Sequence, residues 1–252
     1  MQHEITEKHN VFEENGEVMC AGWARTPVFE YNSEQSKTSG KHSERDCYFI
    51  SNTEVSLYLS VENLGMEFAV KIAVADLKRG GVIYDCVVKK FVFSKNELPE
   101  SGSSGELLYT DKRLQLQLTN TPNGRFLKCD FIDFGGIKNL YFNINLKKTA
   151  GESLNEIAPF ERDRKYFYLK RFVPKFVAGG IIRVGGMEYS LNETTTNAFV
   201  IVFRNRYVNA IKRVFLQALT RRRCIRVSSI VQYSPLLPPV GVWGETRGEP
   251  RR

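Results

Sequence analysis

The sequence has few of the residues on which most catalytic and metal sites depend. Its three histidines are His3, His9 and His42, so all of them lie near the N-terminus. This distribution argues against a histidine-based catalytic triad or a zinc site in the rest of the chain. No GxSxG, Walker A or GxGxxG motif occurs. We therefore predict no metal and no cofactor, and the sequence leaves open whether the protein is an enzyme.

Cysteine is sparse and scattered along the chain. The five cysteines are Cys20, Cys47, Cys86, Cys129 and Cys224, and no two of them form a CxxC pair. A disulfide framework or a zinc site would need clustered cysteines. We therefore predict free thiols, buried or half-buried, in a reducing compartment.

Long apolar runs are also missing. No stretch of about 18 apolar residues occurs, so no transmembrane helix is predicted. Residues 1–8 lack the apolar segment of a secretory signal peptide. On these grounds we expect a cytoplasmic protein.

Most of the chain lacks the positive charge that the whole sequence carries. The net charge is +8, but residues 204–252 hold 11 Lys and Arg against 2 Asp and Glu, so residues 1–203 sum to −1. Ten of those 11 basic residues are arginines. A basic chain would ordinarily indicate a nucleic-acid-binding protein, but here the charge belongs to the tail alone.

The body of the chain alternates apolar and polar residues, which is the pattern of β-strands. Residues 54–62, 68–74 and 113–118 show this period of two most clearly. Pro122-Asn123-Gly124 is a strong hairpin signal between two such runs. Long strands joined by short turns predict an all-β fold, an antiparallel lipocalin-like barrel or a curved sandwich, because closure removes open edges.

Three segments follow from these patterns. Residues 1–45 read as an N-terminal arm and surface loop, and residues 46–203 as the antiparallel β domain. Residues 204–252 form an Arg-rich tail. Apolar residues recur every three or four positions from Phe203 to Leu219, which predicts an amphipathic helix followed by disorder.

Several short motifs, in this order and spacing, resemble a bacterial family known as domain of unknown function 2804. They lie at residues 4–6 (EIT), 15–16 (NG), 21–25 (AGWAR), 45–52 (RDCYFISN), 158–160 (APF), 165–168 (KYFY) and 188–191 (EYSL). The resemblance covers residues 1–199. It implies a lipocalin-like β architecture, distantly akin to the carotenoid-hydratase and AttH group, and no established activity.

The resemblance ends abruptly. Family members usually continue after the equivalent of Ala198-Phe199 with an Asp-Trp-Gly-Arg-Gly block and a second β-rich half, whereas this chain reads VIVFRNR at residues 200–206. We hypothesise that a frameshift or truncation near residue 200 produced the Arg-rich tail. The hypothesis would be contradicted if the gene encoded these residues in one uninterrupted reading frame and close homologues had the same tail.

Carboxylates are the only plausible catalytic groups in the body. Asp130 and Asp133 lie on the strand before a Gly-Gly turn, and Asp85 lies within another strand. Acid–base catalysis would require two of them to converge in a pocket. Asp130 has the strand parity of Phe126 and Ile132, which leaves an inward orientation open, although solvent-facing or turn roles are the simpler expectation for all three.

Other conspicuous residues have structural explanations. Gly179-Gly180 and Gly185-Gly186 flank a strand and are predicted to be hairpin glycines. Trp23 and Arg25 either pack within the arm or cap a barrel mouth.

The interior of the predicted barrel is expected to be apolar and aromatic, with Phe68, Phe142 and Phe172 in it. Such an interior either holds a lipid-like ligand or is filled by its own side chains.

Three functions are consistent with the sequence. The leading hypothesis is a non-enzymatic β-barrel protein that binds an apolar or lipid-like ligand. The second is a hydratase- or isomerase-like enzyme acting on a lipid or isoprenoid, by analogy of fold. The third is a module whose basic tail binds anionic membrane or nucleic acid. The sequence identifies no catalytic or ligand-binding residue.

Overall fold

The computed structural model describes residues 3–37, 41–80, 82–91, 98–99, 104–135, 138–149, 151–160, 163–207, 215–219 and 224–228. The chain divides into two units, Met1–Ala210 and Ile211–Arg252. In the second unit the described residues form one antiparallel strand pair, β17 (Phe215–Leu219) and β18 (Cys224–Ser228).

One large sheet of fourteen strands dominates the described part of the first unit. Its main path, in spatial order, runs β8 (Val82–Phe91), β7 (Glu67–Asp76), β6 (Val55–Asn63), β5 (Lys41–Ser51), β16 (Asn197–Tyr207), β14 (Asp163–Val184), β12 (Lys138–Lys148), β11 (Gly124–Phe134), β10 (Leu114–Thr121) and β9 (Gly105–Thr110). Every pairing along this path is antiparallel.

Shorter elements complete the unit. The large sheet also includes β1 (His3–Glu4), β3 (Gly22–Ala24), β13 (Leu154–Phe160) and β15 (Met187–Leu191). A separate parallel pair joins β2 (His9–Asn10) to β4 (Phe29–Glu30), and α1 (Ser33–Lys37) follows. Within the described residues no helix is both long and apolar enough to cross a membrane.

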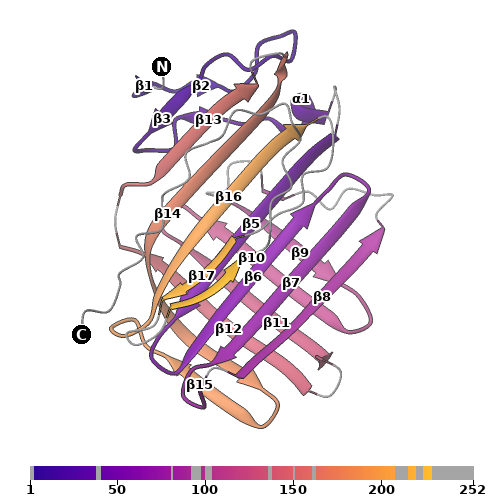
Figure 1. Ribbon diagram of the computed structural model, residues 1–252, viewed down its shortest axis with the longest axis vertical. Coiled ribbons are helices and arrows are strands. Elements are labelled where there is room, and N and C mark those ends of the chain that lie inside the picture. The colour runs from indigo at the N-terminus through magenta and orange to yellow at the C-terminus, as the bar shows by residue number, and fades with distance from the viewer. Residues whose placement is uncertain are drawn as a thin grey trace, which may run out of the picture. The chain divides into compact units, whose positions relative to one another are not determined.

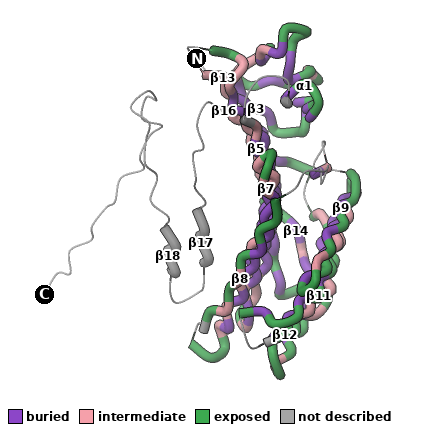
Figure 2. Tube along the Cα trace, turned by 90° about the vertical axis from the view of Figure 1, so that its right-hand side faces the viewer, coloured by how far each residue is buried: buried purple, intermediate pink, exposed green. Residues whose placement is uncertain are grey.

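The sheet curls so that its two halves face each other. The half from β8 to β16 lies in front of the half from β12 to β9, and their strands cross at a steep angle (Figure 1). An edge-on view shows the two layers with buried residues between them (Figure 2). The end strands β8 and β9 each pair with one described neighbour and not with each other. The fold is therefore an all-β antiparallel half-barrel, which confirms the predicted class.

The main core lies between these layers, where the alternating strands direct their apolar residues. On β10, Leu114, Leu116 and Leu118 are at most 2% exposed, and their register partners on β11 are also buried. Phe68 and Phe142 belong to this core, as predicted.

The prediction for Phe172 was wrong. Phe172 lies on the opposite face of β14 and packs edge-to-face against Phe199, with ring centroids 5.7 Å apart. The adjacent residue Val173 takes the inward position and is 5% exposed. β14 carries apolar residues on both faces, so alternation alone could not tell which face is inside.

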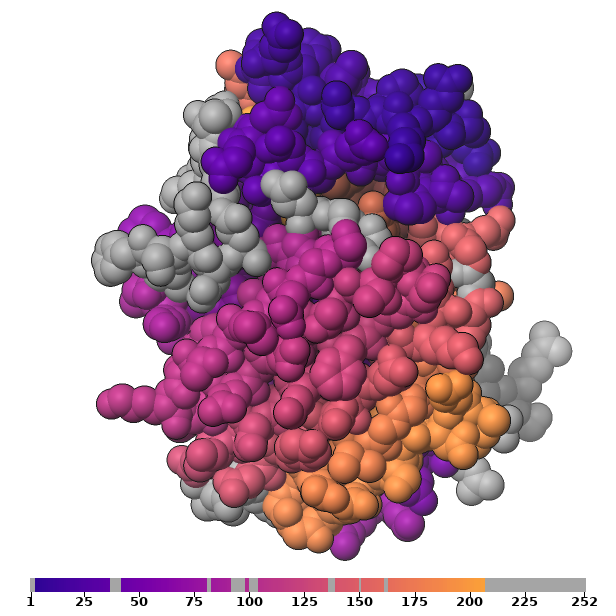
Figure 3. Space-filling view, turned by 180° about the vertical axis from the view of Figure 1, so that it is seen from behind, coloured from indigo at the N-terminus to yellow at the C-terminus, as the bar shows by residue number. Residues whose placement is uncertain are grey.

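The N-terminal arm builds a second, smaller core at one end of the sheet. Its apolar residues pack on β13 and β14 and form a cluster of Ile5, Val11, Phe12, Val18, Ala24, Val28, Phe29, Tyr31, Ile157, Phe167 and Leu169. Seen from behind, the arm lies above the layer of β9 to β12 (Figure 3). Trp23 and Arg25 lie on the outside of this arm, with the Arg25 guanidinium 5.4 Å from the Trp23 ring and 3.1 Å from Glu4.

Two predicted boundaries differ from the structure. The surface loop predicted up to residue 45 ends earlier, because β5 begins at Lys41. The amphipathic helix predicted from Phe203 is wrong where it can be checked, because β16 continues to Tyr207 and residues 215–219 are also a strand. The strand continues because Arg204 and Arg206 find buried partners on its inward face. The rest of the predicted helix and the disorder after it lie outside the described residues.

The two Gly-Gly pairs have different roles. Gly185-Gly186 connect β14 to β15, and Gly185 has a φ of 60°, so the hairpin prediction holds there. Gly179-Gly180 lie inside β14 and not in a turn. Gly180 has a φ of 133°, and a Cβ there would lie 2.1 Å from the carbonyl oxygen of Asn143. The sheet therefore requires glycine at this position for close backbone approach.

Candidate functional site

Charged side chains are buried where the main core meets the arm. Alternation along β5 points Glu44, Asp46 and Tyr48 inward, and each is 1% exposed. Arg204 on the neighbouring strand β16 is also 1% exposed, and its Nη1 lies 2.7 Å from Oδ1 of Asp46. A buried ion pair of this kind holds its strands in one register, because either charge alone would be costly to bury.

The guanidinium of Arg204 makes further contacts around this pair. Its Nη2 donates a hydrogen bond to the carbonyl oxygen of Pro99 at 2.9 Å, and its Nη1 donates one to the carbonyl of Phe203 at 2.8 Å. Burial acts to lower the pKa of Arg204, but the charges of Asp46 and Glu44 outweigh it and raise the pKa above its ordinary value. Arg204 is therefore a fixed positive charge inside the protein.

The second buried carboxylate is also engaged. Oε1 of Glu44 accepts a hydrogen bond from Tyr31 Oη at 3.1 Å, and Oε2 accepts one from Asn63 Nδ2 at 3.5 Å. Burial and the charge of Glu44 raise the pKa of Tyr31. Glu44 and Asp46 thus contact two different strands and the arm. Because their oxygens are engaged in these contacts, the two carboxylates stabilise the junction between the cores and are poorly placed for acid–base chemistry.

Two more arginines extend the buried cluster. Arg171 on β14 donates from Nε to Asn155 Oδ1 at 2.9 Å. Burial, together with the charges of Arg204 and Arg125, lowers the pKa of Arg171 to about 10. Arg125 on β11 donates from Nη1 to two backbone carbonyls of its own hairpin at 2.8 Å each.

Arg206 on β16 connects the arm to the sheet through hydrogen bonds. It is fully buried, and its guanidinium lies over the rings of Phe12 and Phe167 at 5.2 and 5.7 Å. It donates to four backbone carbonyls, those of Gly16, Gln35, Ser36 and Lys165. Two arginines of the predicted basic tail, Arg204 and Arg206, are therefore internal structural residues and cannot serve an exposed anion-binding surface.

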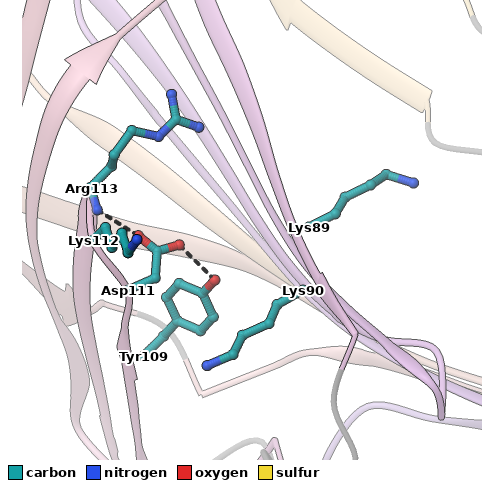
Figure 4. Close-up of a pocket in the computed structure, with 6 residues that line it drawn as sticks. All are labelled: Lys89, Lys90, Tyr109, Asp111, Lys112 and Arg113. Atoms are coloured by element: carbon teal, nitrogen blue, oxygen red, sulfur yellow. Dashed lines mark hydrogen bonds between the residues drawn. The ribbon is translucent and has the colours of Figure 1, made fainter.

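A basic pocket lies at the seam between β8 and β9, the two end strands of the main path, which do not pair with each other. Its volume is about 320 Å³, and it is lined by Lys89, Lys90, Tyr109, Asp111, Lys112 and Arg113 (Figure 4). Lys90 extends toward the Tyr109 ring, whereas Lys89 extends away from it. The ammonium of Lys89 instead bonds Glu67 at 2.9 Å. Lys90, Lys112 and Arg113 are exposed and supply the positive charge of the pocket.

The floor of this seam pocket is aromatic. Tyr109 is 3% exposed and stacks on Phe68 of the main core, with centroids 5.3 Å apart and planes 14° apart. Its Oη donates to Oδ2 of Asp111 at 2.9 Å, while Oδ1 of Asp111 accepts the backbone N–H groups of Arg113 and Leu114. Partial burial acts to raise the pKa of Asp111, but these hydrogen bonds lower it below its ordinary value.

The carboxylates considered from the sequence do not form a site. Asp85, Asp130 and Asp133 are all exposed, and none lines the seam pocket. Asp130 points outward because Cys129 and Phe131 occupy the inward positions of β11. Asp133 has a φ of 58° where the β11–β12 register shifts. The simpler expectation, solvent-facing or turn roles, is the one that the structure supports.

The histidines differ in exposure, and the described cysteine side chains are free thiols. His3 is exposed, while His9 and His42 are partly buried, and the described residues contain no group of three or more His, Cys, Asp or Glu that could hold a metal ion. Four cysteines are free thiols as predicted: Cys47 and Cys129 are buried, and Cys20 and Cys86 are half-buried. The side chain of Cys224 is not among those that the structure describes.

Sequence patterns alone did not identify the main residues of the buried charged cluster or of the seam pocket. Asp46 has the parity of the inward residues Tyr48 and Ile50, so a charge at that position could have been noticed. Arg204 was assigned to the tail, and its partner lies 158 residues away. Lys90 and Arg113 belong to different strands and turns, and only the curl of the sheet brings them to one pocket.

Comparison with known proteins agrees with the sequence resemblance. The family described as "Domain of unknown function (DUF2804)" matches residues 2–202. A comparison with curated proteins found no match.

Two solved structures are similar over most of this chain. A protein assigned as AttH from Nitrosomonas europaea is 6% identical, with 71% of this chain and 55% of that chain covered and a TM-score of 0.41. Kievitone hydratase from Nectria haematococca is 10% identical, with 74% and 56% covered and a TM-score of 0.42. The similarity thus spans a little over half the length of these two proteins.

Proposed function

This chain belongs to the family described as domain of unknown function 2804, and we propose that it is a non-enzymatic binding protein for a small, lipid-like anion. The ligand class is an apolar chain that carries a carboxylate or a similar negative headgroup. The observation that carries the proposal is the seam pocket, in which basic side chains surround an aromatic floor over the apolar core.

The charge of the pocket favours an anionic headgroup. Lys90, Lys112 and Arg113 carry three positive charges, and Asp111 carries one negative charge. Both oxygens of Asp111 are already bonded to Tyr109 and to backbone N–H groups, so they are poorly placed to bind the lysines as well. A ligand carboxylate would complete this arrangement through charge-assisted hydrogen bonds.

The position of the pocket favours an apolar chain on the same ligand. Tyr109 lines the pocket with 3% of its surface exposed, and its ring stacks on Phe68 behind it. The edges of β8 and β9 are not joined by ladder hydrogen bonds, so no described strand closes the seam above the ring. Because the core behind Phe68 is filled by side chains, we place the ligand in the seam and not deep between the layers. A volume of about 320 Å³ suits a short chain.

The buried carboxylates favour binding over catalysis. An enzyme of the hydratase or isomerase type would need acidic groups that face a substrate cavity. Asp46 and Glu44 instead bond Arg204 and Tyr31 within the protein, and neither lines the seam pocket.

Isothermal titration calorimetry with octanoate, an anion with a short apolar chain, tests the proposal. We expect the double variant Lys90→Glu/Arg113→Glu to bind octanoate at least about tenfold more weakly, because two charge-assisted contacts are replaced by repulsion. Lys128→Glu is the matched control, since Lys128 is exposed on β11 and lies outside the pocket. Octan-1-ol, which has the same chain and no charge, is expected to bind more weakly than octanoate.

Two results would refute the proposal. Equal binding of octanoate by the wild-type protein and the double variant would remove the pocket as the site. Equal binding of octan-1-ol and octanoate would remove the role of the headgroup.

A further inference from the structure

The edge strand β8 has an outward face whose residues are complementary in charge to the same face read in the opposite direction. Ile83, Asp85, Val87, Lys89 and Phe91 alternate along this face, as apolar, acidic, apolar, basic and apolar. Val87 is the centre of this pattern. Two copies of the strand placed antiparallel about Val87 would therefore match apolar with apolar residues and acid with base.

This face is exposed in the first unit. Ile83, Val87 and Phe91 are 49%, 47% and 72% exposed, which makes them three of the most exposed large apolar residues in the described chain. Asp85 is exposed as well, and the side chain of Lys89 is 52% exposed. Exposed apolar residues along a strand edge are characteristic of a surface that pairs with another strand.

β8 is also an end strand of the large sheet. β8 pairs with β7 from Val82 to Phe91 along one edge, and no described strand pairs with its other edge. In Figure 1 it is the outermost strand of the front layer. An edge with which no described strand pairs is a template for a further antiparallel strand.

We propose that two copies of this chain associate through β8, edge to edge and antiparallel, about a two-fold axis at Val87. In this register Asp85 lies opposite Lys89 of the partner subunit, and Ile83 lies opposite Phe91 of the partner subunit. The pairing is isologous, so each charge contact and each apolar contact occurs twice. Opposite charges and apolar side chains that face each other across strands stabilise a sheet, and like charges there destabilise it.

Charge variants test both the interface and its register. Asp85→Lys gives an outward face with two lysines, and Lys89→Asp gives an outward face with two aspartates. Each variant alone would place like charges opposite each other, and we expect its dimer dissociation constant to rise by about tenfold or more. An equimolar mixture of the two variants restores every acid–base contact, and we expect it to form a heterodimer. Loss of the Lys89–Glu67 contact within one chain could not produce this recovery.

Sedimentation equilibrium of the full-length protein gives the masses. We expect wild-type chains to reach twice 28.9 kDa. Asp130→Lys, at an exposed position on β11, is the matched control and should dimerise like the wild type. Circular dichroism of each variant verifies the β fold.

A cysteine scan fixes the axis independently. Val87→Cys places two thiols directly opposite each other, about 5 Å apart at Cβ, and should form an intersubunit disulfide on mild oxidation. Ile83→Cys places the two thiols eight residues apart along the strand, about 26 Å, and should not.

Three results would overturn the proposal. The first is a wild-type protein that stays monomeric at about 100 µM. The second is a dimer that Asp85→Lys leaves unchanged. The third is a mixture of the two charge variants that fails to associate. Pairing with an extended segment of another protein in place of a second copy would appear as the first of these results.

Discussion

Removal of Arg204 tests whether the junction between the cores rests on its ion pair with Asp46. The substitution Arg204→Met keeps a long apolar side chain and removes the charge. Asp46 would then be a carboxylate, 1% exposed, whose contact at 2.7 Å has been lost. The carbonyl of Pro99 would lose its hydrogen bond from Arg204 at the same time.

The expected magnitude is large. Breaking one side of a buried ion pair costs about 3–5 kcal/mol, because the remaining charge is left without compensation. An unfolding free energy of about 5–15 kcal/mol is typical of a folded domain, so this loss would remove a substantial part of it. In the double variant Arg204→Met/Asp46→Leu neither charge remains, and we expect it to recover at least about 2 kcal/mol of the loss.

Urea unfolding followed by circular dichroism measures these differences, because the strands of the first unit dominate the signal. Arg183→Met is the matched control. Arg183 pairs with Glu188 at the surface, where both side chains are about half exposed. An exposed pair contributes about 0–1 kcal/mol. A cost for Arg204→Met no greater than that of Arg183→Met would refute the argument, and so would a double variant less stable than the single one.

Two further predictions concern Cys47 and Gly180, which lie within strands of the sheet. Burial raises the pKa of the Cys47 thiol from 9.0 to about 11, so the folded chain keeps a proton that the unfolded chain releases, and stability is lost as the pH rises through this window. In urea unfolding between these pH values, Cys47→Ala should remove up to about 2 kcal/mol of that loss, and an unchanged pH slope would contradict the assignment. Gly180→Ala should lower the unfolding free energy by about 2 kcal/mol or more, because its Cβ would overlap the Asn143 carbonyl, and Gly186→Ala should lower it by less than about 1 kcal/mol. Nothing lies within 4 Å of a Cβ at Gly186, so equal effects at the two glycines would refute the explanation.

Where only one face of a strand is apolar, the sequence predicts both the strand and the face that points inward. On β10 only one face is apolar, so Leu114, Leu116 and Leu118 identify both the strand and its inward side. The same logic fails on β11, where Phe126 and Ile132 on one face alternate with Phe131 on the other. Two apolar rows on one strand give no local signal of which row is inside, and the packing of the opposite layer decides it.

The sites depended on contacts that sequence patterns do not contain. Arg204 looked like part of a foreign tail, because its partner Asp46 is distant in sequence and adjacent only after β16 pairs with β5. The seam pocket combines the end of β8 with the turn between β9 and β10. These segments meet because the sheet curls, and the amount of curl is a property of all its strands together.

The length of β14 has a consequence for how the first unit loses its structure. This strand has 22 residues. One end pairs with β13 and carries Phe167 and Leu169 in the arm core, while the other pairs with β12 and carries Ile182 and Val184 in the main core. Because the two cores share this strand, we expect the loss of either core to loosen the strand that supports the other. We therefore expect the arm to unfold together with the main core.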